Sequence, residues 1–156
     1  MSVELTPGGT RGSEWPKMPG FVMSAGLAVM VFAYRLLGDR FRIGGQPLVL
    51  LTTVGAKTGK ARRTLLGRFA DGNNWLIVAS FAGSARHPAW YFNLARNPDK
   101  VWVEVDGRTQ RVRPESLQGQ EREDALLRII ALAPGYGAYQ EKTDREIPVV
   151  RLTPIA

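Results

Sequence analysis

Residues 52–64 combine glycines with positive charge, which suits this segment to hold an anion. The segment reads TTVGAKTGKARRT, and four cations lie within seven of its residues: Lys57, Lys60, Arg62 and Arg63. A glycine-containing turn between strands exposes backbone N–H groups, and these can bind a phosphate together with lysine and arginine. The segment is not a P-loop, because the Gly-Lys-Ser/Thr order and a following helix are missing. The alternative is an ordinary hairpin whose basic residues keep it soluble.

Residues 80–94, SFAGSARHPAWYFNL, form a second candidate segment. A strand end, a loop of small residues and a helix start make a natural corner for an anion or a ring. Trp90, Tyr91 and Phe92 cannot all face one way on a helix, so at least one of them is expected to be peripheral. His87 precedes a helical proline, and we interpret it as a structural residue rather than a base.

Residues 134–148, PGYGAYQEKTDREIP, form a third candidate segment, interpreted as a loop with two tyrosines three residues apart. Tyr136 and Tyr139 can face one pocket, where a tyrosine ring stacks and its hydroxyl, with an ordinary pKa near 10, donates a proton or orients an oxygen. The alternative is two half-buried aromatics on a lid, with Asp144 and Arg145 as a cap and a surface partner.

The composition excludes several kinds of chemistry. The 156 residues include no cysteine and one histidine, His87. Disulfide scaffolds, cysteine-ligated zinc, iron–sulfur clusters and thiol nucleophiles are therefore excluded, and no metal site is expected. An enzyme built from this chain would take its chemistry from a cofactor. The chain is 44% hydrophobic and 22% charged, which are values of a globular protein.

The net charge of +7 is concentrated in one region. Nine basic residues and one acidic residue lie between Arg40 and Pro98, and twelve basic and thirteen acidic residues make up the rest. The window carries +8 and the remainder −1, which favours an anionic partner for that region. Nucleic acid, anionic lipid and a phosphorylated cofactor all fit this charge.

The N-terminal part of the chain has no strand pattern. Residues 1–20 are rich in Gly, Pro and polar residues and predict a flexible arm, and residues 21–38 predict an apolar helix. The uncharged run 21–34 is too short to span a bilayer, which needs about 20 residues, and no signal-peptide cleavage site follows it. A helix buried in the core is the favoured interpretation, and a helix in a membrane interface is the alternative.

Strand and hairpin patterns dominate the rest of the chain, interrupted by two short helical patterns. Strands are expected at 48–54, 62–70, 75–80, 101–105, 108–113 and 149–152, and helices at 88–95 and 121–132. Consecutive hairpins favour a small antiparallel barrel with helices packed outside it. We therefore predict a mainly β (α+β) fold with one domain over residues 39–156.

The order of the three candidate segments resembles a known family. LLTTVGAKTGKARRT, HPAWYFNLARNP and YGAYQEKTDREIPVV look like the deazaflavin-dependent nitroreductase and quinone reductase family of actinobacteria. Members of that family bind coenzyme F-420 on a split β-barrel of the flavin-reductase type. The resemblance covers residues 47–152, about two thirds of the chain.

The resemblance implies a role for individual residues. The phosphate and lactyl end of the coenzyme would be held by Gly55, Lys57, Thr58, Gly59 and Arg62, followed by Arg63 and Thr64. The helix that flanks the coenzyme would contribute Pro88, Trp90, Tyr91 and Asn93. Ser80 would lie near the reactive edge of the deazaflavin, and Tyr136 and Tyr139 beside the substrate as catalytic residues. Two positions depart from the family pattern: Phe81 stands where many relatives have lysine, and Lys142 where some nitroreductases have a third aromatic.

The implied activity is hydride transfer from reduced coenzyme F-420 to a small electrophile such as a quinone, a nitroaromatic or an activated alkene. The coenzyme is strongly anionic, in agreement with the +8 window. The alternatives are a reductase that binds flavin mononucleotide (FMN) and a basic barrel that binds nucleic acid. No nucleic acid is expected, because the cations cluster too tightly for an extended backbone.

The expected location is the cytoplasm, or the inner face of the cell membrane if residues 21–37 contact lipid. The oligomeric state and the physiological substrate stay open at this stage.

Overall fold

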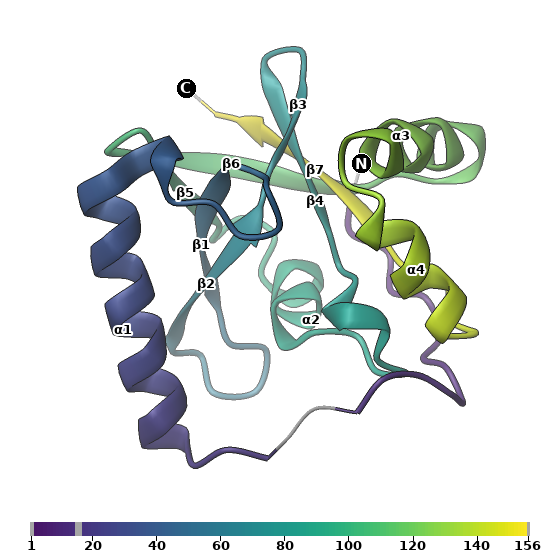
Figure 1. Cartoon of the computed structure of the whole chain (residues 1–156), viewed down its shortest axis with the longest axis horizontal. Helices are drawn as coiled ribbons and strands as arrows, with labels where there is room; N and C mark the ends of the chain where they lie inside the picture. The colour runs from purple at the N-terminus through teal and green to yellow at the C-terminus, as the bar shows by residue number, and fades with distance from the viewer. Residues whose placement is uncertain (1, 15–16, 156) are drawn as a thin grey trace.

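The computed structural model describes residues 2–14 and 17–155, and consists of one antiparallel sheet with helices outside it (Figure 1). The strands are β1 (Leu48–Val54), β2 (Ala61–Gly67), β3 (Phe69–Asp71), β4 (Asn74–Val78), β5 (Trp102–Val105), β6 (Arg108–Ser116) and β7 (Val149–Pro154). The helices are α1 (Gly20–Leu37), α2 (Ala89–Arg96), α3 (Gly119–Leu132) and α4 (Gly135–Lys142), with 3-10 turns η1 (Gly38–Arg40) and η2 (Phe81–Gly83). The mainly β fold with flanking helices is confirmed.

The sheet curls around one apolar core. Its strands follow the order β2-β1-β5-β6-β7-β4-β3, so that β2 and β3 form the edges, and β2 contacts β4 across the opening. In β1, Val49 and Leu51 point into the barrel core, whereas Leu48 and Leu50 point outward, as the two-residue period of a strand requires. The outcome is a split barrel whose outer face also carries apolar side chains.

The predicted hairpin at residues 101–113 is present. Asp106 and Gly107 connect β5 to β6, with φ of 54° and 72°. Two successive residues with positive φ are typical of the tight hairpin turns that match the twist of the strands, and Asp-Gly is a favoured pair there.

Helix α1 lies on the outer face of β1 and β2, on the side of the molecule opposite α3 and α4 (Figure 1). The interpretation as a core helix is wrong, since only Val31 and Tyr34 in it are buried. The outer face offers few apolar partners, mainly Leu48 and Leu50, so only the last turns of the helix are covered. The Tyr34 hydroxyl donates to the Leu48 carbonyl at 2.9 Å, and burial raises the pKa of Tyr34 to about 12.

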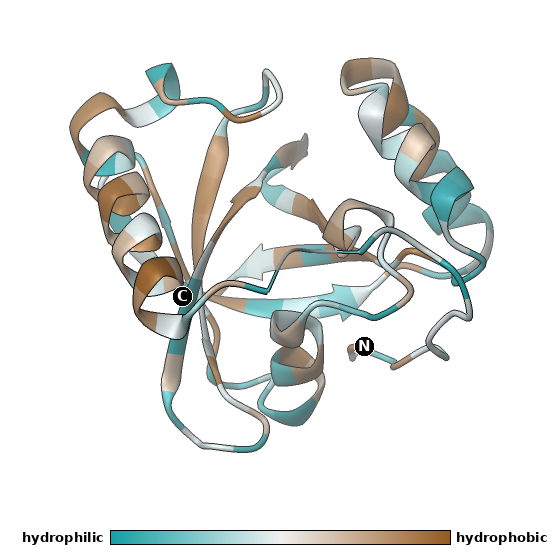
Figure 2. Ribbon diagram, turned by 60° about the horizontal axis from the view of Figure 1, so that its bottom comes forward, coloured by the Kyte–Doolittle hydropathy of each residue, from teal (hydrophilic) through white to brown (hydrophobic). Residues whose placement is uncertain are grey.

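The first turns of α1 are exposed on all sides, and apolar colours dominate the helix in Figure 2. Together with η1 the helix covers Gly20–Arg40, which by length and composition alone is sufficient to cross a membrane. The uncharged run 21–34 is by itself too short to span a bilayer, but the helix continues past it through Arg35 to Leu37, as predicted for residues 21–38.

Residues 135–142 form helix α4, where the glycines predicted a loop. Tertiary contacts override the weak local propensity. The Gln140 side-chain oxygen accepts the Ile147 N–H at 3.0 Å, and its amide donates to the Arg145 carbonyl at 2.8 Å. The tyrosines therefore lie on a helix held at its C-terminal end, and not on a loop.

The N-terminal arm lies along the body between α2 and α4. Val3 is buried in the barrel core, the Gly9 N–H donates to the Ala85 carbonyl at 2.8 Å, and the Ser13 N–H donates to the Gly83 carbonyl at 2.9 Å. The division into arm, apolar helix and barrel domain stays a prediction, as does the flexibility of the arm.

Asp144 holds the arm by its carboxylate. It accepts the Thr10 and Arg11 N–H groups at 2.8 and 3.2 Å, and also the Thr10 hydroxyl. These bonds, the hydroxyl first, lower the pKa of Asp144 from 3.8 to about 2. A carboxylate with a lowered pKa stabilises the folded arm above about pH 4 and loses this effect as the pH falls through about 2.

We expect the Asp144→Asn variant to release the arm at neutral pH, because the amide lacks the negative charge that strengthens these bonds. Trypsin should then cut faster after Arg11, as followed by mass spectrometry. The matched control is Asp124→Asn, an exposed carboxylate on α3 that accepts from Gln120 at 2.8 Å. Equal cleavage of both variants would contradict the assignment.

Candidate functional site

The turn between β1 and β2 is closed by its own backbone. The Gly55 N–H donates to the Lys60 carbonyl at 2.8 Å, and the Gly59 N–H donates to the Gly55 carbonyl at 2.9 Å. Gly59 has a φ of 69°, which favours glycine. A Cβ at Gly55 would lie 2.6 Å from the Thr58 hydroxyl oxygen, so the turn is tight there. Lys57 is exposed at the tip and can bind an anion.

Helix α2 supports this turn from behind. The Asn93 side-chain oxygen accepts the Ala56 N–H at 2.9 Å, and its amide donates to the Thr53 hydroxyl at 3.0 Å. Asn93 is 6% exposed and Tyr91 is fully buried. Asn93 therefore positions the turn, whereas the Tyr91 hydroxyl donates to the Glu4 carbonyl of the N-terminal arm.

The other residues of the predicted flanking helix behave similarly. Trp90 is 8% exposed and belongs to the barrel core, and Pro88 is buried just before the helix. Phe92 is 41% exposed, which confirms that the three successive aromatics do not share one face. A direct contact of this helix with a coenzyme stays a prediction.

Strand β2 separates residues that the sequence groups together. Its register pairs Arg62 with Thr53 and Arg63 with Thr52, and successive side chains alternate between the two faces of the sheet. Arg62 and Thr64 share one face, whereas Arg63 lies on the other face with Leu65 and Gly67. A ligand on one face of this edge strand therefore meets only one of the two arginines directly.

The two tyrosines line one cavity of about 240 Å³ between β2, the segment before β1 and the α3–α4 corner. Its walls are Ile43, Gly44, Gln46, Leu48, Leu65, Gly67, Leu132, Ala133, Pro134, Gly135, Tyr136 and Tyr139. The Tyr136 and Tyr139 rings meet edge to face at 5.6 Å, and Phe69 packs on Tyr136 at 5.5 Å. Burial raises the pKa of Tyr136, which keeps its hydroxyl protonated as a donor.

Ser80 is not among the residues that line the tyrosine cavity, and the segment that follows it packs on α4 through η2. Ser80 immediately precedes η2, and a Cβ at Gly83 would lie 2.8 Å from the Tyr139 carbonyl. Only glycine allows so close a contact, so the two elements approach at backbone distance. At the same corner the Lys142 ammonium lies 5.7 Å from the centre of the Tyr139 ring.

Comparisons with known proteins decide the family. Residues 32–154 match the family model described as F420H(2)-dependent quinone reductase. The chain belongs to this family. An F420H(2)-dependent quinone reductase of Mycobacterium tuberculosis (strain H37Rv) is 42% identical over 113 residues, which cover 70% of this chain and 75% of that protein. The family resemblance stated from the three segments is confirmed.

Two solved structures share the fold. One, named as an F420-H2 dependent reductase (FDR-A), is 40% identical with a TM-score of 0.61, over 68% of this chain and 93% of that one. The other, described as a domain-swapped dimer, is 35% identical with a TM-score of 0.62, over 82% of this chain and 98% of that one. The split barrel of the flavin-reductase type is thereby confirmed.

The arrangement fits the coenzyme that the family name implies. The cavity, which two aromatic rings line, suits a planar ring, and the exposed Lys57 ammonium suits an anion. The backbone N–H groups of Gly55, Ala56, Gly59 and Lys60 in the turn already donate within the protein. Gly67 lines the cavity, where a Cβ would lie 3.2 Å from the Tyr136 hydroxyl oxygen. The two parts lie at opposite ends of β2, about 20 Å apart for a strand of this length. An elongated molecule with a ring at one end and anions at the other matches this spacing.

The interpretation of Arg145 as a surface partner is wrong, because its side chain is buried, with 2% of the residue exposed. The sequence offers no signal for the burial of Arg145, since an arginine between Asp144 and Glu146 is typical of a surface.

His87 is buried as well, with its Nε2 2.8 Å from the Thr6 carbonyl oxygen. Burial, with a smaller effect of Arg145, lowers the pKa of His87, so the ring is neutral and structural.

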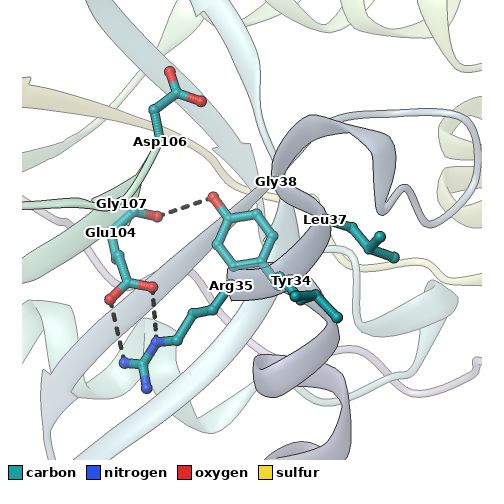
Figure 3. Close-up of a pocket in the computed structure, with 8 residues that line it drawn as sticks. Tyr34, Arg35, Leu37, Gly38, Glu104, Asp106 and Gly107 are labelled. Carbon is teal, nitrogen blue, oxygen red and sulfur yellow. Dashed lines mark hydrogen bonds and ion pairs between the residues drawn. The ribbon is translucent and has the colours of Figure 1, made fainter.

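A larger hollow of about 490 Å³ lies at the C-terminal end of α1 (Figure 3). Its main polar groups already pair with each other, because Arg35 donates to both carboxylate oxygens of Glu104 at 3.1 and 3.2 Å. Tyr34 donates to the Glu104 carbonyl at 3.1 Å. We therefore place the candidate active site at the tyrosine cavity.

Proposed function

We propose that this chain reduces a quinone by hydride transfer from reduced coenzyme F-420. Membership of the F420H(2)-dependent quinone reductase family makes it an oxidoreductase with this coenzyme. The observation that supports the site is the position of the tyrosine cavity and the cationic turn at the two ends of β2. The bound coenzyme supplies the hydride, and the protein supplies binding, orientation and a proton.

Each proposed residue has one task. Lys57 binds the anionic end, together with Arg62 where the coenzyme crosses the edge of β2, or with Arg63 where it stays on the face of Leu65 and Gly67. The Tyr139 hydroxyl donates a hydrogen bond to the acceptor oxygen, with Tyr136 and Ser80 in support. The hydride brings the quinone two electrons and one proton. The second proton comes from the tyrosine hydroxyl, which solvent then reprotonates. The product is a hydroquinone.

Titration tests this function directly. Reduced coenzyme F-420 is expected to bind and reduced FMN to bind much more weakly, and adding a quinone should then oxidise the coenzyme. A screen with a nitroaromatic and an activated alkene determines whether the pocket accepts other electrophiles. Binding of FMN in preference to the coenzyme would overturn the proposal, and so would binding of oligonucleotides alone.

We also propose that α1 contacts an anionic membrane surface, at the inner face of the cell membrane. The helix exposes apolar side chains along its length, with Phe21 in the first turn 78% and Phe32 in the fourth turn 69% exposed. The strand register places Arg63, Trp102 and Arg111 in a row on the same face of the sheet as Leu48 and Leu50, beside α1, and both arginines are exposed there. Apolar insertion and basic residues together give stable binding to anionic lipid, whereas either alone is marginal. A quinone dissolved in the bilayer would then be close to the site.

We expect the double variant Phe21→Ser/Phe32→Ser to lose at least about tenfold in affinity for phosphatidylglycerol vesicles, since each buried phenylalanine contributes about 2 kcal/mol. Vesicle sedimentation measures this. Leu127→Ser on α3, 66% exposed, is the matched control and should not change binding. If the wild-type chain forms a dimer that the double variant cannot form, and neither binds vesicles, a second copy covers α1 and the membrane proposal fails.

A further inference from the structure

The segment that follows β4 has an unusual backbone. Phe81, Ala82 and Gly83 have φ of 43°, 49° and 80°, so three successive residues adopt the left-handed region. Two of them carry a Cβ, and such residues stay in this region only where the surroundings constrain them. The strain is located beside Tyr139, because the Gly83 backbone packs on the Tyr139 carbonyl.

The side chain of Arg145 holds this segment in its left-handed conformation through hydrogen bonds. Its guanidinium donates to the carbonyls of Ala79 at 3.1 Å, Ser80 at 2.8 Å and Ser84 at 2.7 Å. The same group lies 3.2 Å from His87 Nδ1, which accepts as the neutral ring. All three carbonyls come from the strand end and the strained turn, so one side chain holds both ends of the segment.

The environment of Arg145 is unlike that of a stabilising ion pair. In the described ranges 2–14 and 17–155, the groups that Arg145 contacts through its guanidinium are backbone carbonyls and a histidine, with no carboxylate within 4.0 Å. Burial lowers the pKa of Arg145. A buried cation without a carboxylate is costly, and such groups cluster at functional sites.

We propose that Arg145 is a positioning residue for hydride transfer, because its buried guanidinium fixes the segment of Ser80 against the helix of Tyr139. This inference rests on the proposed function. Ser80 and Tyr139 lie on different elements, and their relative position depends on the contact between η2 and α4. Without the guanidinium the three carbonyls lose their common donor, and the strained turn can relax toward an ordinary conformation. A displacement of about 1 Å is sufficient to slow a transfer strongly.

The test compares Arg145→Met and Arg145→Lys with Arg151→Met. Arg151 is the matched control, because it is a partly buried arginine on β7 whose partners are the carboxylates of Asp71, Glu115 and Glu121. Amide hydrogen exchange of residues 80–85 is measured without coenzyme, together with Tm. Single-turnover hydride transfer to a quinone and the Kd of the coenzyme are measured separately. The lysine variant keeps a charge and part of the hydrogen bonding, so it remains informative if the methionine variant folds poorly.

We expect Arg145→Met to speed exchange in residues 80–85 at least tenfold and to slow single-turnover transfer at least tenfold, while the Kd of the coenzyme changes less than threefold. Arg145→Lys should recover part of both effects. Arg151→Met should lower Tm but leave both readouts unchanged. Equal effects of Arg145→Met and Arg151→Met, or unchanged exchange in Arg145→Met, would overturn the inference. A wild-type chain without quinone reduction would overturn the proposed function instead, and the exchange data would still decide whether Arg145 holds the segment.

Discussion

Replacing Lys57 and Arg62 together by alanine is expected to raise the Kd of coenzyme F-420 about a hundredfold. Each residue would donate a charge-assisted hydrogen bond to an anionic group, and such a bond contributes about 1.5–3 kcal/mol, or about tenfold or more in affinity. Because neither side chain reaches the tyrosine cavity, the turnover at saturating coenzyme should change little. A fluorescence titration with the coenzyme, at two salt concentrations, measures the effect.

The control for this prediction removes the same charge elsewhere. Arg108 and Arg128 are exposed, on the start of β6 and on α3, so Arg108→Ala/Arg128→Ala lowers the net charge by the same amount away from the turn. Equal weakening in both double variants would mean that the coenzyme senses only the overall field. The single variants Arg62→Ala and Arg63→Ala add a further distinction, because the two arginines lie on opposite faces of β2. Whichever single arginine variant weakens binding more identifies the face that the coenzyme occupies.

Replacing Tyr139 by phenylalanine is expected to lower kcat for quinone reduction about a hundredfold and to leave the Kd of the coenzyme nearly unchanged. The ring and its edge-to-face contact with Tyr136 stay in place, so the variant removes only the hydroxyl. Proton donation by a positioned side chain contributes about 10²–10⁴ in rate, which sets the size of the loss. Steady-state kinetics with a quinone series and a separate coenzyme titration distinguish kcat from binding.

Tyr34→Phe is the matched control for Tyr139→Phe. It also removes one tyrosine hydroxyl, which donates to the Leu48 and Glu104 carbonyls beneath α1. Leu48 is a wall of the tyrosine cavity, but Tyr34 itself does not line it. We expect it to lower Tm without a change in kcat. A Tyr139→Phe enzyme with wild-type kcat would remove this tyrosine from the proton-donating role, and Tyr136→Phe would then be the next variant to measure.

Much of the fold could be predicted from the sequence, because its signals are local. The alternation of Val101, Val103 and Val105 and the Asp106-Gly107 pair predict the β5–β6 hairpin, which is present. Prediction failed where long-range contacts decide. The residues of α4 have glycines typical of a loop, yet Gln140 fixes them as a helix through contacts with Arg145 and Ile147.

The candidate site also has one part that the local sequence predicts and another that depends on contacts between distant residues. The anion turn around Lys57 is a local feature, and its residues are adjacent in the sequence. Whether Arg62 and Arg63 face one ligand depends on the pairing of β2 with β1, which places them on opposite faces. The support of the turn by Asn93 depends on the packing of α2 against β1, which no local pattern of α2 shows.

The sequence by itself determined the kind of chemistry, because residue types and the order of motifs need no coordinates. The absence of cysteine and the single histidine point to a bound cofactor, and the three motifs identify the family. Only the tertiary structure decided which side chains are buried. It buries Arg145 beneath the strand end, against its interpretation as a surface partner, and leaves the first turns of α1 exposed, against the interpretation as a core helix. The physical reason is that burial depends on partners far away along the chain, whereas charge and hydropathy belong to each residue.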